Sequence, residues 1–453
     1  MLKRKLTTKL EEWKTRSNGS TAIMIDGARR VGKSFIAEEF AKTHYKSYIL
    51  IDFYLQNQIV KDLFENEITN LDSFFALLQS YFNTTLYPRE SVIIFDEVQA
   101  YPRARSMIKY LVADGRYDYI ETGSLLSIKK NTKDILIPSE EESVKLYPLD
   151  FEEFLWAIGE DSLMDLIREK YATKTPLGQA AHRKIMTIFR QYLLVGGMPQ
   201  AVNEYLSNKN FKTVDIIKRN ILKLYREDIM KHAGKDADKV LRVYDYIPAG
   251  LQNQNKRFQL ADADGATTAR YRNYEDALFW LSESMIVNYC FNTTEPTIGL
   301  ASREDRSEFK CYLGDTGLLI SHTFSESELT SAEIYNKILF DKLEFNNGFI
   351  IENIIAQMLR ASNHPLYYYS NTGKDSISDR MEVDFLIAKS KITSRHNITP
   401  IEVKSSNRYT LTSIRKFVDK FSTQTATPIV LHTSDLEEKD GFLYLPLYMA
   451  GLL

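Results

Sequence analysis

A glycine-rich stretch at residues 27–34 constrains this chain more than any other part of the sequence. It follows an apolar run at residues 21–25 and precedes a helix-like segment at residues 35–40. Its eight residues are Gly27, Ala28, Arg29, Arg30, Val31, Gly32, Lys33 and Ser34. Glycines let the backbone wrap closely around a polyphosphate, and a following helix points its free N–H groups at the anion. A strand, a glycine loop and a helix in this order therefore predict a nucleoside triphosphate site in an α/β domain.

Two side chains of this loop predict specific contacts with ATP and Mg²⁺. We expect the Lys33 ammonium to neutralise the β- and γ-phosphate oxygens and the Ser34 hydroxyl to ligate Mg²⁺. The rest of the loop and Phe35, which follows it directly, complete the expected nucleotide-binding set. The alternative is a plain glycine turn, which the flanking strand and helix patterns make the weaker interpretation.

Acidic and hydroxyl residues at two further strand ends fit the same site. The apolar run at residues 91–95 ends in Asp96 and Glu97, and a strand-like segment at residues 119–121 ends in Thr122. In a parallel α/β sheet, ligands bind at the carboxyl ends of the strands. We expect Asp96 to hold Mg²⁺, Glu97 to act as general base on the attacking water, and Thr122 to sense the γ-phosphate. A simple strand-end turn is the alternative for Thr122.

Length and composition are those of an ordinary globular protein with about three domains in its 453 residues. The 58 lysines and arginines nearly balance the 60 aspartates and glutamates, so the net charge of −2 gives no global attraction to nucleic acid or membrane. Two cysteines are too few for a disulfide framework. The sequence shows neither a signal peptide nor an apolar run of the roughly 18 residues that a membrane span needs. These features predict a cytoplasmic protein.

Several motifs together resemble those of the prokaryotic AAA-family ATPases of unknown cellular role. They lie at residues 27–34, 94–99, 121–124, 147–154, 196–199 and 312–318. The resemblance covers nearly the whole chain, and implies an ATPase domain over residues 1–155 with a helical lid over residues 156–212. It also implies that Pro199 contacts the nucleotide base, although the residues at 196–199 equally fit a helix stop. Glu121 departs from the family pattern, which has an apolar residue there.

Residues 213–330 predict a winged-helix-like domain. A helix that begins at Ala266 carries an apolar stripe with members three and four residues apart. The stripe consists of Tyr271, Tyr274, Leu278, Leu281 and Met285. Arg270 and Arg272 lie off the stripe near the helix start, where a helix-turn-helix contacts DNA, and residues 286–291 and 308–313 would form the wing. Many such modules are only structural, so DNA contact and a structural role both stay open.

Residues 331–453 predict a second α/β domain. From residue 348 onward the expected order is helix, three strands, helix and strand. Asp384 lies on one strand, and Glu402 and Lys404 lie two residues apart on the next, so both point to the same side. Two carboxylates that share a hard cation, with a lysine beside the attacking water, are what phosphodiester hydrolysis requires. The constellation resembles the core of PD-(D/E)XK nucleases, with Glu352 as an additional helical acid.

Two functions fit these expectations for an α/β protein. The first is an AAA-type ATPase that acts on nucleic acid through a nuclease-like C-terminal domain, with a metal site at Asp384 and Glu402. The second is a nucleotide-switched regulatory protein that binds protein partners and cuts nothing.

Overall fold

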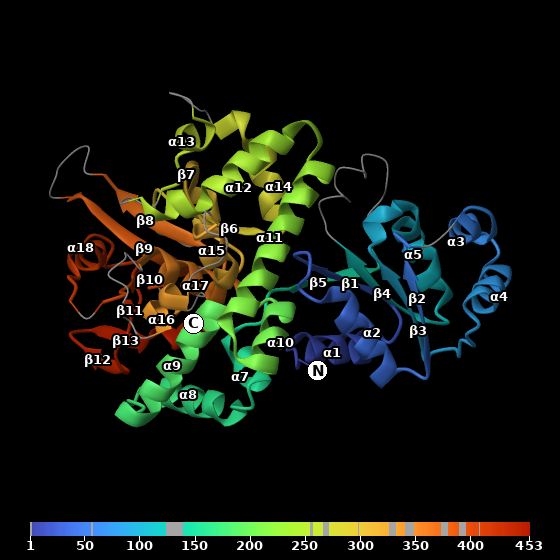
Figure 1. Cartoon of the computed structure of the whole chain (residues 1–453), viewed down its shortest axis with the longest axis horizontal. Coiled ribbons are helices and arrows are strands. Elements are labelled where there is room, and N and C mark those ends of the chain that lie inside the picture. Colours follow the sequence, from blue (N-terminus) through green and yellow to red (C-terminus); the bar gives the residue numbers. More distant parts are fainter. Residues whose placement is uncertain are drawn as a thin grey trace. The chain divides into compact units, whose positions relative to one another are not determined.

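The computed structural model describes residues 2–55, 58–123, 139–253, 257–265, 271–297, 299–325, 332–339, 348–372, 379–388, 396–406 and 408–453. The chain divides into two compact units, one of residues 3–147 and one mainly of residues 148–282 and 286–453, and each contains its own sheet (Figure 1). The first unit thus ends before residue 155, where we expected the ATPase domain to end. The boundaries predicted after residues 212 and 330 both fall inside the second unit.

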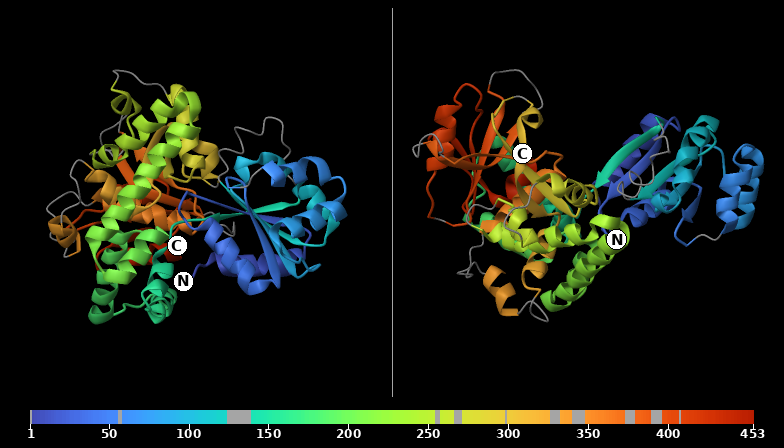
Figure 2. Two further views of the ribbon diagram at one scale, coloured as in Figure 1. Left: turned by 45° about the vertical axis from the view of Figure 1, so that its right-hand side comes forward. Right: turned by 90° about the horizontal axis from the view of Figure 1, so that it is seen from above.

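The first unit is built on a five-stranded sheet in which all strands are parallel (Figure 2). The strand order is β2-β3-β4-β1-β5, which confirms the predicted parallel α/β sheet. The strands are β1 (Ala22–Gly27), β2 (Ser47–Asp52), β3 (Ser91–Asp96), β4 (Asp118–Gly123) and β5 (Glu141–Leu146). Because β3, β4 and β1 are neighbours, their carboxyl ends bring Asp96, Gly123 and Gly27 to one edge of the sheet.

The fifth strand, β5, is the one that the sequence analysis missed. It pairs with β1 from Ala22–Glu141 to Gly27–Leu146, at the edge of the sheet. Charged residues alternate there with only two apolar ones, Val144 and Leu146, because an edge strand keeps one side toward water. Such a pattern is weak next to the continuous apolar runs of β1 and β3.

Helices cover both faces of this sheet because alternate strand residues point to opposite sides. On one face, Val92 and Ile94 of β3 pack with apolar side chains of α1 (Leu6–Ser17) and α2 (Lys33–His44). On the other, Ile93 and Phe95 pack with the remaining helices. These are α3 (Gln58–Asp62), the π-helix η1 (Leu63–Glu67), α4 (Leu71–Phe82) and α5 (Pro102–Asp114), while η2 (Val98–Ala100) is a short 3-10 turn.

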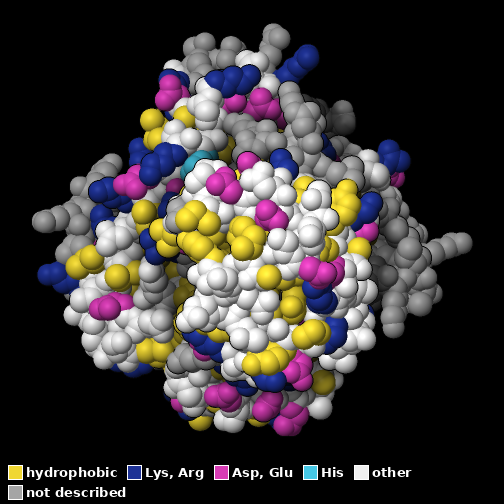
Figure 3. Space-filling model, turned by 90° about the vertical axis from the view of Figure 1, so that its right-hand side faces the viewer, with side chains coloured by type: hydrophobic (Ala, Val, Ile, Leu, Met, Phe, Trp, Pro, Cys, Tyr) yellow, Lys and Arg dark blue, Asp and Glu magenta, His cyan; other side chains and the backbone are white. Residues whose placement is uncertain are grey.

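The face that α3 and α4 present carries charges of both signs (Figure 3). Lysine and arginine side chains alternate there with aspartate and glutamate, and hydrophobic side chains lie between them. On this face no continuous basic area is visible.

The second unit begins with helices and has an eight-stranded sheet. The helices are α7 (Phe151–Ala157), α8 (Asp161–Thr173), α9 (Gln179–Val195), α10 (Pro199–Asn208), α11 (Phe211–His232), η3 (Gly234–Asp236), α12 (Ala237–Gln252), α13 (Leu260–Asp264), η4 (Tyr271–Asn273), α14 (Glu275–Glu283), η5 (Leu300–Arg303), α15 (Thr316–Thr323), α16 (Ala332–Leu339), α17 (Gly348–Ala361), α18 (Thr412–Lys420) and η7 (Leu447–Leu452). None of the helices in the described ranges combines the length and apolar character needed to cross a membrane.

The sheet of the second unit has the order β12-β13-β11-β10-β9-β8-β6-β7. Its strands are β6 (Val287–Thr293), β7 (Glu304–Leu313), β8 (Tyr367–Asn371), β9 (Met381–Ala388), β10 (Ile398–Val403), β11 (Ile429–His432), β12 (Glu437–Lys439) and β13 (Phe442–Pro446). The order of helix and strands predicted from residue 348 onward is confirmed by α17, β8, β9, β10, α18 and β11. Cys290 and Cys311, on β6 and β7, are buried and free.

The hairpin that we expected to form the wing of a winged-helix domain is part of the eight-stranded sheet of the second unit. The β6–β7 pair joins the C-terminal strands through parallel pairing of Phe291 and Asn292 with Tyr367 and Tyr368 on β8. The alternation of apolar and polar residues within a short segment specifies a hairpin. The third strand that the hairpin pairs with is distant in the sequence, so this local pattern does not specify it. Of the helix predicted from Ala266, residues 266–270 lie outside the described residues, and the rest forms η4 and α14.

Three of the motif segments meet inside the second unit. Leu149 N donates to Gly197 O at 2.7 Å, and Gly197 N donates to Oδ2 of Asp315 at 2.6 Å. A side chain at Gly317 would place its Cβ 2.6 Å from Gly196 Cα, so this close approach requires glycine. Residues 147–154, 196–199 and 312–318 therefore share a structural junction.

Candidate nucleotide site and carboxylate–lysine cluster

The 27–34 loop connects β1 to α2 in the first unit. Gly32 precedes α2 with a φ of 98°, in the left-handed region that glycine tolerates best. Lys33 Nζ donates to the carbonyl oxygens of Gly27 at 3.0 Å and Ala28 at 3.1 Å. Burial lowers the pKa of Lys33, and the carboxylates of Glu97, Asp26 and Asp96 oppose that shift. The ammonium is thus held inside the loop, beside the acidic end of β3.

Asp96 and Thr122 lie on neighbouring strands and contact each other. The Thr122 hydroxyl donates to Oδ1 of Asp96 and accepts from the Glu97 backbone N–H at 3.3 Å. Burial raises the pKa of Asp96, while hydrogen bonds from Thr122 and Ser34 lower it. Ser34 and Asp96, the two residues predicted to hold Mg²⁺, therefore lie in hydrogen-bond contact. Their hydroxyl and carboxylate oxygens are ligands of the kind that Mg²⁺ prefers.

Glu97 is held in an unusual backbone conformation directly after β3. Its φ is 53°, in the left-handed region that few residues other than glycine adopt. Gln99 Nε2 donates to Oε2 of Glu97, which fixes the carboxylate. The sequence analysis gave Gln99 no role, because its contact with Glu97 depends on the turn η2 that follows the strand.

Glu121, the residue that departs from the family pattern, belongs to a separate buried group. It lies on the α5 side of β4, where Arg105 donates two hydrogen bonds to Glu141, at 2.6 and 2.7 Å. Burial and the neighbouring Glu141 raise the pKa of Glu121 well above its ordinary value, and Arg105 opposes this shift. Thr122 points the other way, to Asp96, so the departure at Glu121 leaves the Thr122 contact intact.

Four acidic residues of the second unit gather around a lysine that the sequence analysis did not consider. Lys310 on β7 is fully buried. Its Nζ lies 2.8 Å from Oε1 of Glu382, 3.7 Å from Oδ1 of Asp384 and 3.8 Å from Oε2 of Glu352. The Tyr312 hydroxyl donates to the same Glu352 oxygen at 3.1 Å. We call Lys310, Glu352, Glu382, Asp384, Glu402 and Lys404 the carboxylate–lysine cluster.

Glu402 and Lys404 form an ion pair at the end of β10. Lys404 Nζ donates to Oε1 of Glu402 at 2.7 Å, and both side chains are largely buried. Burial raises the pKa of Glu402 to about 8, with Asp384 adding to the shift and Lys404 opposing it. Asp384 Oδ2 accepts from the Val403 backbone N–H at 2.8 Å. The predicted residues are therefore close together, but Lys404 is bound to Glu402 rather than set apart beside a water.

The arrangement differs from the metal site that the sequence predicted. Within the described ranges, no group of three or more His, Cys, Asp and Glu side chains has the arrangement of a metal site. The Lys310 ammonium lies among three of the carboxylates instead. In the sequence, Lys310 stands out only as the one charged residue of the apolar stretch 309–313, which favours no particular partner.

The other predicted contact residues lie elsewhere. Pro199 occupies the first turn of α10, a position that suits proline because its missing N–H has no helical partner there. This matches the helix-boundary interpretation, and its contact with a nucleotide base stays a prediction. Arg272 is exposed in η4, and Arg270 lies outside the described residues.

Comparisons with known proteins match different parts of the chain. A family model described as an AAA domain matches residues 19–155. Two models described as domains of unknown function, DUF8612 and DUF4143, match residues 186–328 and 347–449. No curated protein gave a significant match.

Several solved structures match this chain at low sequence identity. A Walker-type ATPase of Pyrococcus abyssi is 17% identical, with 71% of this chain and 96% of that chain covered and a TM-score of 0.43. The RuvB Holliday junction branch migration motor of Thermotoga maritima is 13% identical (63% and 89% covered, TM-score 0.29). The ORC1 protein of Aeropyrum pernix, in complex with DNA, is 9% identical (71% and 92% covered, TM-score 0.26).

These three likenesses are too distant to carry an argument about function. The match over residues 19–155 coincides with the parallel sheet and with the loop that holds Lys33 and Ser34. The family match, the parallel sheet and the loop together identify the first unit as an AAA-type P-loop ATPase domain.

Proposed function

We propose that this ATPase is a nucleotide-switched binding protein, whose second unit binds partners and does not cut nucleic acid. ATP and Mg²⁺ act at the first unit, and the carboxylate–lysine cluster of the second unit is a structural and binding element. The proposal that the second unit does not cut nucleic acid rests on the position of the Lys310 ammonium, which lies within 4 Å of three carboxylates.

In the first unit, the residues at the strand ends divide the work on ATP. When ATP binds, the Lys33 ammonium leaves the carbonyl oxygens of Gly27 and Ala28 and contacts the phosphate oxygens. It interacts more strongly with these charged oxygens than with neutral carbonyl groups. Ser34 and Asp96 would hold Mg²⁺, which neutralises charge on the β- and γ-phosphates. Glu97, oriented by Gln99, takes the proton of the attacking water. The Thr122 hydroxyl connects the backbone of Glu97 to the carboxylate of Asp96.

In the second unit, a divalent ion would compete with an ammonium that is already in place. At an effective dielectric constant of about 20, a divalent ion and an ammonium about 4 Å apart repel each other by about 8 kcal/mol. Lys404 is occupied as well, because it is bound to Glu402 at 2.7 Å. Two lysines therefore already offset two of the four carboxylate charges of the cluster from within.

A metal-dependent nuclease is the second candidate function. It is favoured by Asp384 and Glu402, which lie on the neighbouring strands β9 and β10 and influence each other's ionisation. For this candidate to hold, Mg²⁺ would have to displace both lysines.

A cleavage assay separates the two candidates. The purified protein is incubated with Mg²⁺ or Mn²⁺, with and without ATP, on linear and circular DNA and on RNA, beside Asp384→Asn as control. We expect ATP turnover in both proteins and no cleavage in either. Cleavage by the wild type that is lost in Asp384→Asn would establish the nuclease and reject the proposal.

A further inference from the structure

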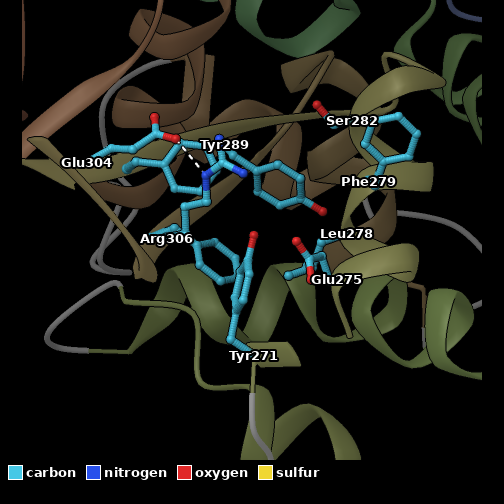
Figure 4. A pocket seen from close by; sticks show the side chains of 10 residues that line it. Tyr271, Glu275, Leu278, Phe279, Ser282, Tyr289, Glu304 and Arg306 are labelled. Carbon is cyan, nitrogen blue, oxygen red and sulfur yellow. Dashed lines mark hydrogen bonds and ion pairs between the residues drawn. The ribbon is translucent and has the colours of Figure 1, made fainter. Parts of the chain in front are cut away.

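A cavity of about 230 Å³ lies in the second unit between α14 and the β6–β7 hairpin (Figure 4). It is lined mainly by aromatic side chains, from η4, α14 and both strands of the hairpin. In Figure 4 the hydroxyl groups of Tyr271 and Tyr289 and the carboxylate of Glu275 point toward one another within it. No residue of the nucleotide site or of the carboxylate–lysine cluster contributes to this cavity.

Two tyrosine rings of the cavity, Tyr271 and Tyr289, each stand nearly perpendicular to the ring of Phe309. The Tyr289 and Phe309 centroids are 5.3 Å apart with an interplanar angle of 84°, and those of Tyr271 and Phe309 are 6.4 Å apart at 75°. One face of Phe309 is stacked on Phe258, with ring centroids 5.5 Å apart, so it is Tyr271 and Tyr289, together with Phe279 and Phe291, that add aromatic surface to the lining of the cavity. The face of an aromatic ring carries negative electrostatic potential, and it attracts cations.

The charged residues of the cavity leave an excess of negative charge. Arg306 Nε donates to Oε1 of Glu304 at 2.7 Å, so these two charges neutralise each other. Glu275, in the first turn of α14, forms no ion pair or hydrogen bond with any described residue. Two carboxylates and one guanidinium give the cavity a net charge of −1.

One residue that lines the cavity, Tyr289, has a buried hydroxyl group without a hydrogen-bond partner among the described residues. Among the described residues, none hydrogen-bonds to the hydroxyl of Tyr289, which is inaccessible to solvent. A buried polar group without a partner is unfavourable by about 1–3 kcal/mol. A small rotation of the ring that exposes this hydroxyl to the cavity would therefore let it accept a hydrogen bond from an N–H donor of a ligand.

We infer that this cavity binds the cationic side chain of a protein partner, a lysine or an arginine. Aromatic faces surround the cation, the Glu275 carboxylate neutralises it, and the Tyr289 hydroxyl accepts from it. The inference rests on the part of the proposed function that assigns partner binding to the second unit. A nucleic-acid strand fits less well, because its phosphates would meet the carboxylates of Glu275 and Asp276 on α14.

The test uses short peptides as probes on the full-length protein without ATP. Blocked pentapeptides Gly-Ser-Xaa-Ser-Gly, with lysine, arginine, norleucine or glutamate at the centre, are titrated by saturation-transfer NMR. We expect the lysine and arginine peptides to bind at least tenfold more tightly than the norleucine peptide, and the glutamate peptide not to bind.

Two matched variants locate the binding. Glu275→Gln should weaken binding of the cationic peptides at least tenfold, whereas Asp276→Asn, which removes a charge from the next residue outside the cavity, should change it less than twofold. Tyr289→Phe keeps the ring and should weaken binding with Glu275 intact. Circular dichroism and ATP turnover of each variant establish that it is folded.

Three results would overturn the inference. They are equal affinity for the norleucine and lysine peptides, equal loss of affinity in the Glu275 and Asp276 variants, or a single-stranded oligonucleotide that binds more tightly after Glu275→Gln. None of these affects ATP turnover or the absence of cleavage, so failure here is distinct from failure of the proposed function.

Discussion

The ammonium of Lys310, whose side chain is fully buried, lies 2.8 Å from the carboxylate of the partly exposed Glu382. Burial alone would lower the pKa of Lys310, but Glu382, Tyr312, Glu352 and Asp384 together raise it well above its ordinary value. The lysine is therefore charged at every physiological pH, and it acts as a permanent internal counter-ion.

Lys310→Met should convert the cluster into a metal site. Without the ammonium, the carboxylates would repel one another and the second unit would lose about 3–5 kcal/mol of stability. A divalent ion would then be the best available counter-ion. We expect Mn²⁺ to raise the thermal midpoint of Lys310→Met and to leave the wild type unchanged, as measured by scanning calorimetry with and without EDTA. Lys439→Met, on the exposed strand β12, serves as control. A wild type that Mn²⁺ stabilises as much as the variant would contradict this account.

Glu97→Gln should separate ATP binding from ATP hydrolysis. The amide keeps the size of the side chain but cannot accept the proton of the attacking water, so turnover should fall by about 10²–10⁴-fold. Binding of a fluorescent ATP analogue should stay within a few fold of the wild type. Lys33→Ala should instead weaken binding itself, because it removes the charge beside the phosphates. Wild-type turnover in Glu97→Gln would show that another residue is the base.

DNA binding through Arg270 and Arg272 is a prediction that can be tested directly. Each phosphate contact releases counter-ions, so replacing both arginines by alanine should weaken binding and flatten its dependence on salt. The measurement is fluorescence anisotropy of a labelled duplex at several salt concentrations. If affinity and salt slope are unchanged in the double variant, this surface does not contact DNA.

The buried Lys218 predicts how the stability of the second unit depends on pH. Burial lowers the pKa of Lys218 to about 8, although Asp215 and Asp315 oppose the shift, and its Nζ donates to Leu194 O at 2.8 Å. Between about pH 8 and 10.5 the unfolded chain binds more protons than the folded one, so stability should rise with pH across this window.

Hydrogen-exchange protection of α11 and α15, corrected for the intrinsic pH dependence of exchange, measures this effect. Protection in the wild type should increase from pH 8 toward pH 10. In Lys218→Met the increase should be absent, because the neutral side chain has no proton to lose. The same slope in both proteins would assign the pH dependence to another group.

Much of the nucleotide site was predictable because each of its parts is encoded locally. The glycine loop is one contiguous stretch, and Asp96 and Thr122 each mark the end of a strand, so the parallel topology alone brings them together. Gln99 and Lys310 were not predictable in this way. Their partners, Glu97 and Glu382, are set by a left-handed turn and by the pairing of distant strands. The wing was wrongly placed for the same reason, since only β8 determines which sheet the β6–β7 hairpin joins.

The pairing of Phe291 on β6 with Tyr367 on β8 also has a consequence for how the protein is made. Apart from residues 283–285, the first unit uses only residues up to 147, so most of it can fold while the ribosome is still translating the rest. The β6–β7 hairpin emerges long before β8 and has no neighbour on its inner edge until then. Nascent chains stalled before residue 367 should therefore expose an unpaired strand edge, the kind of surface that chaperones recognise.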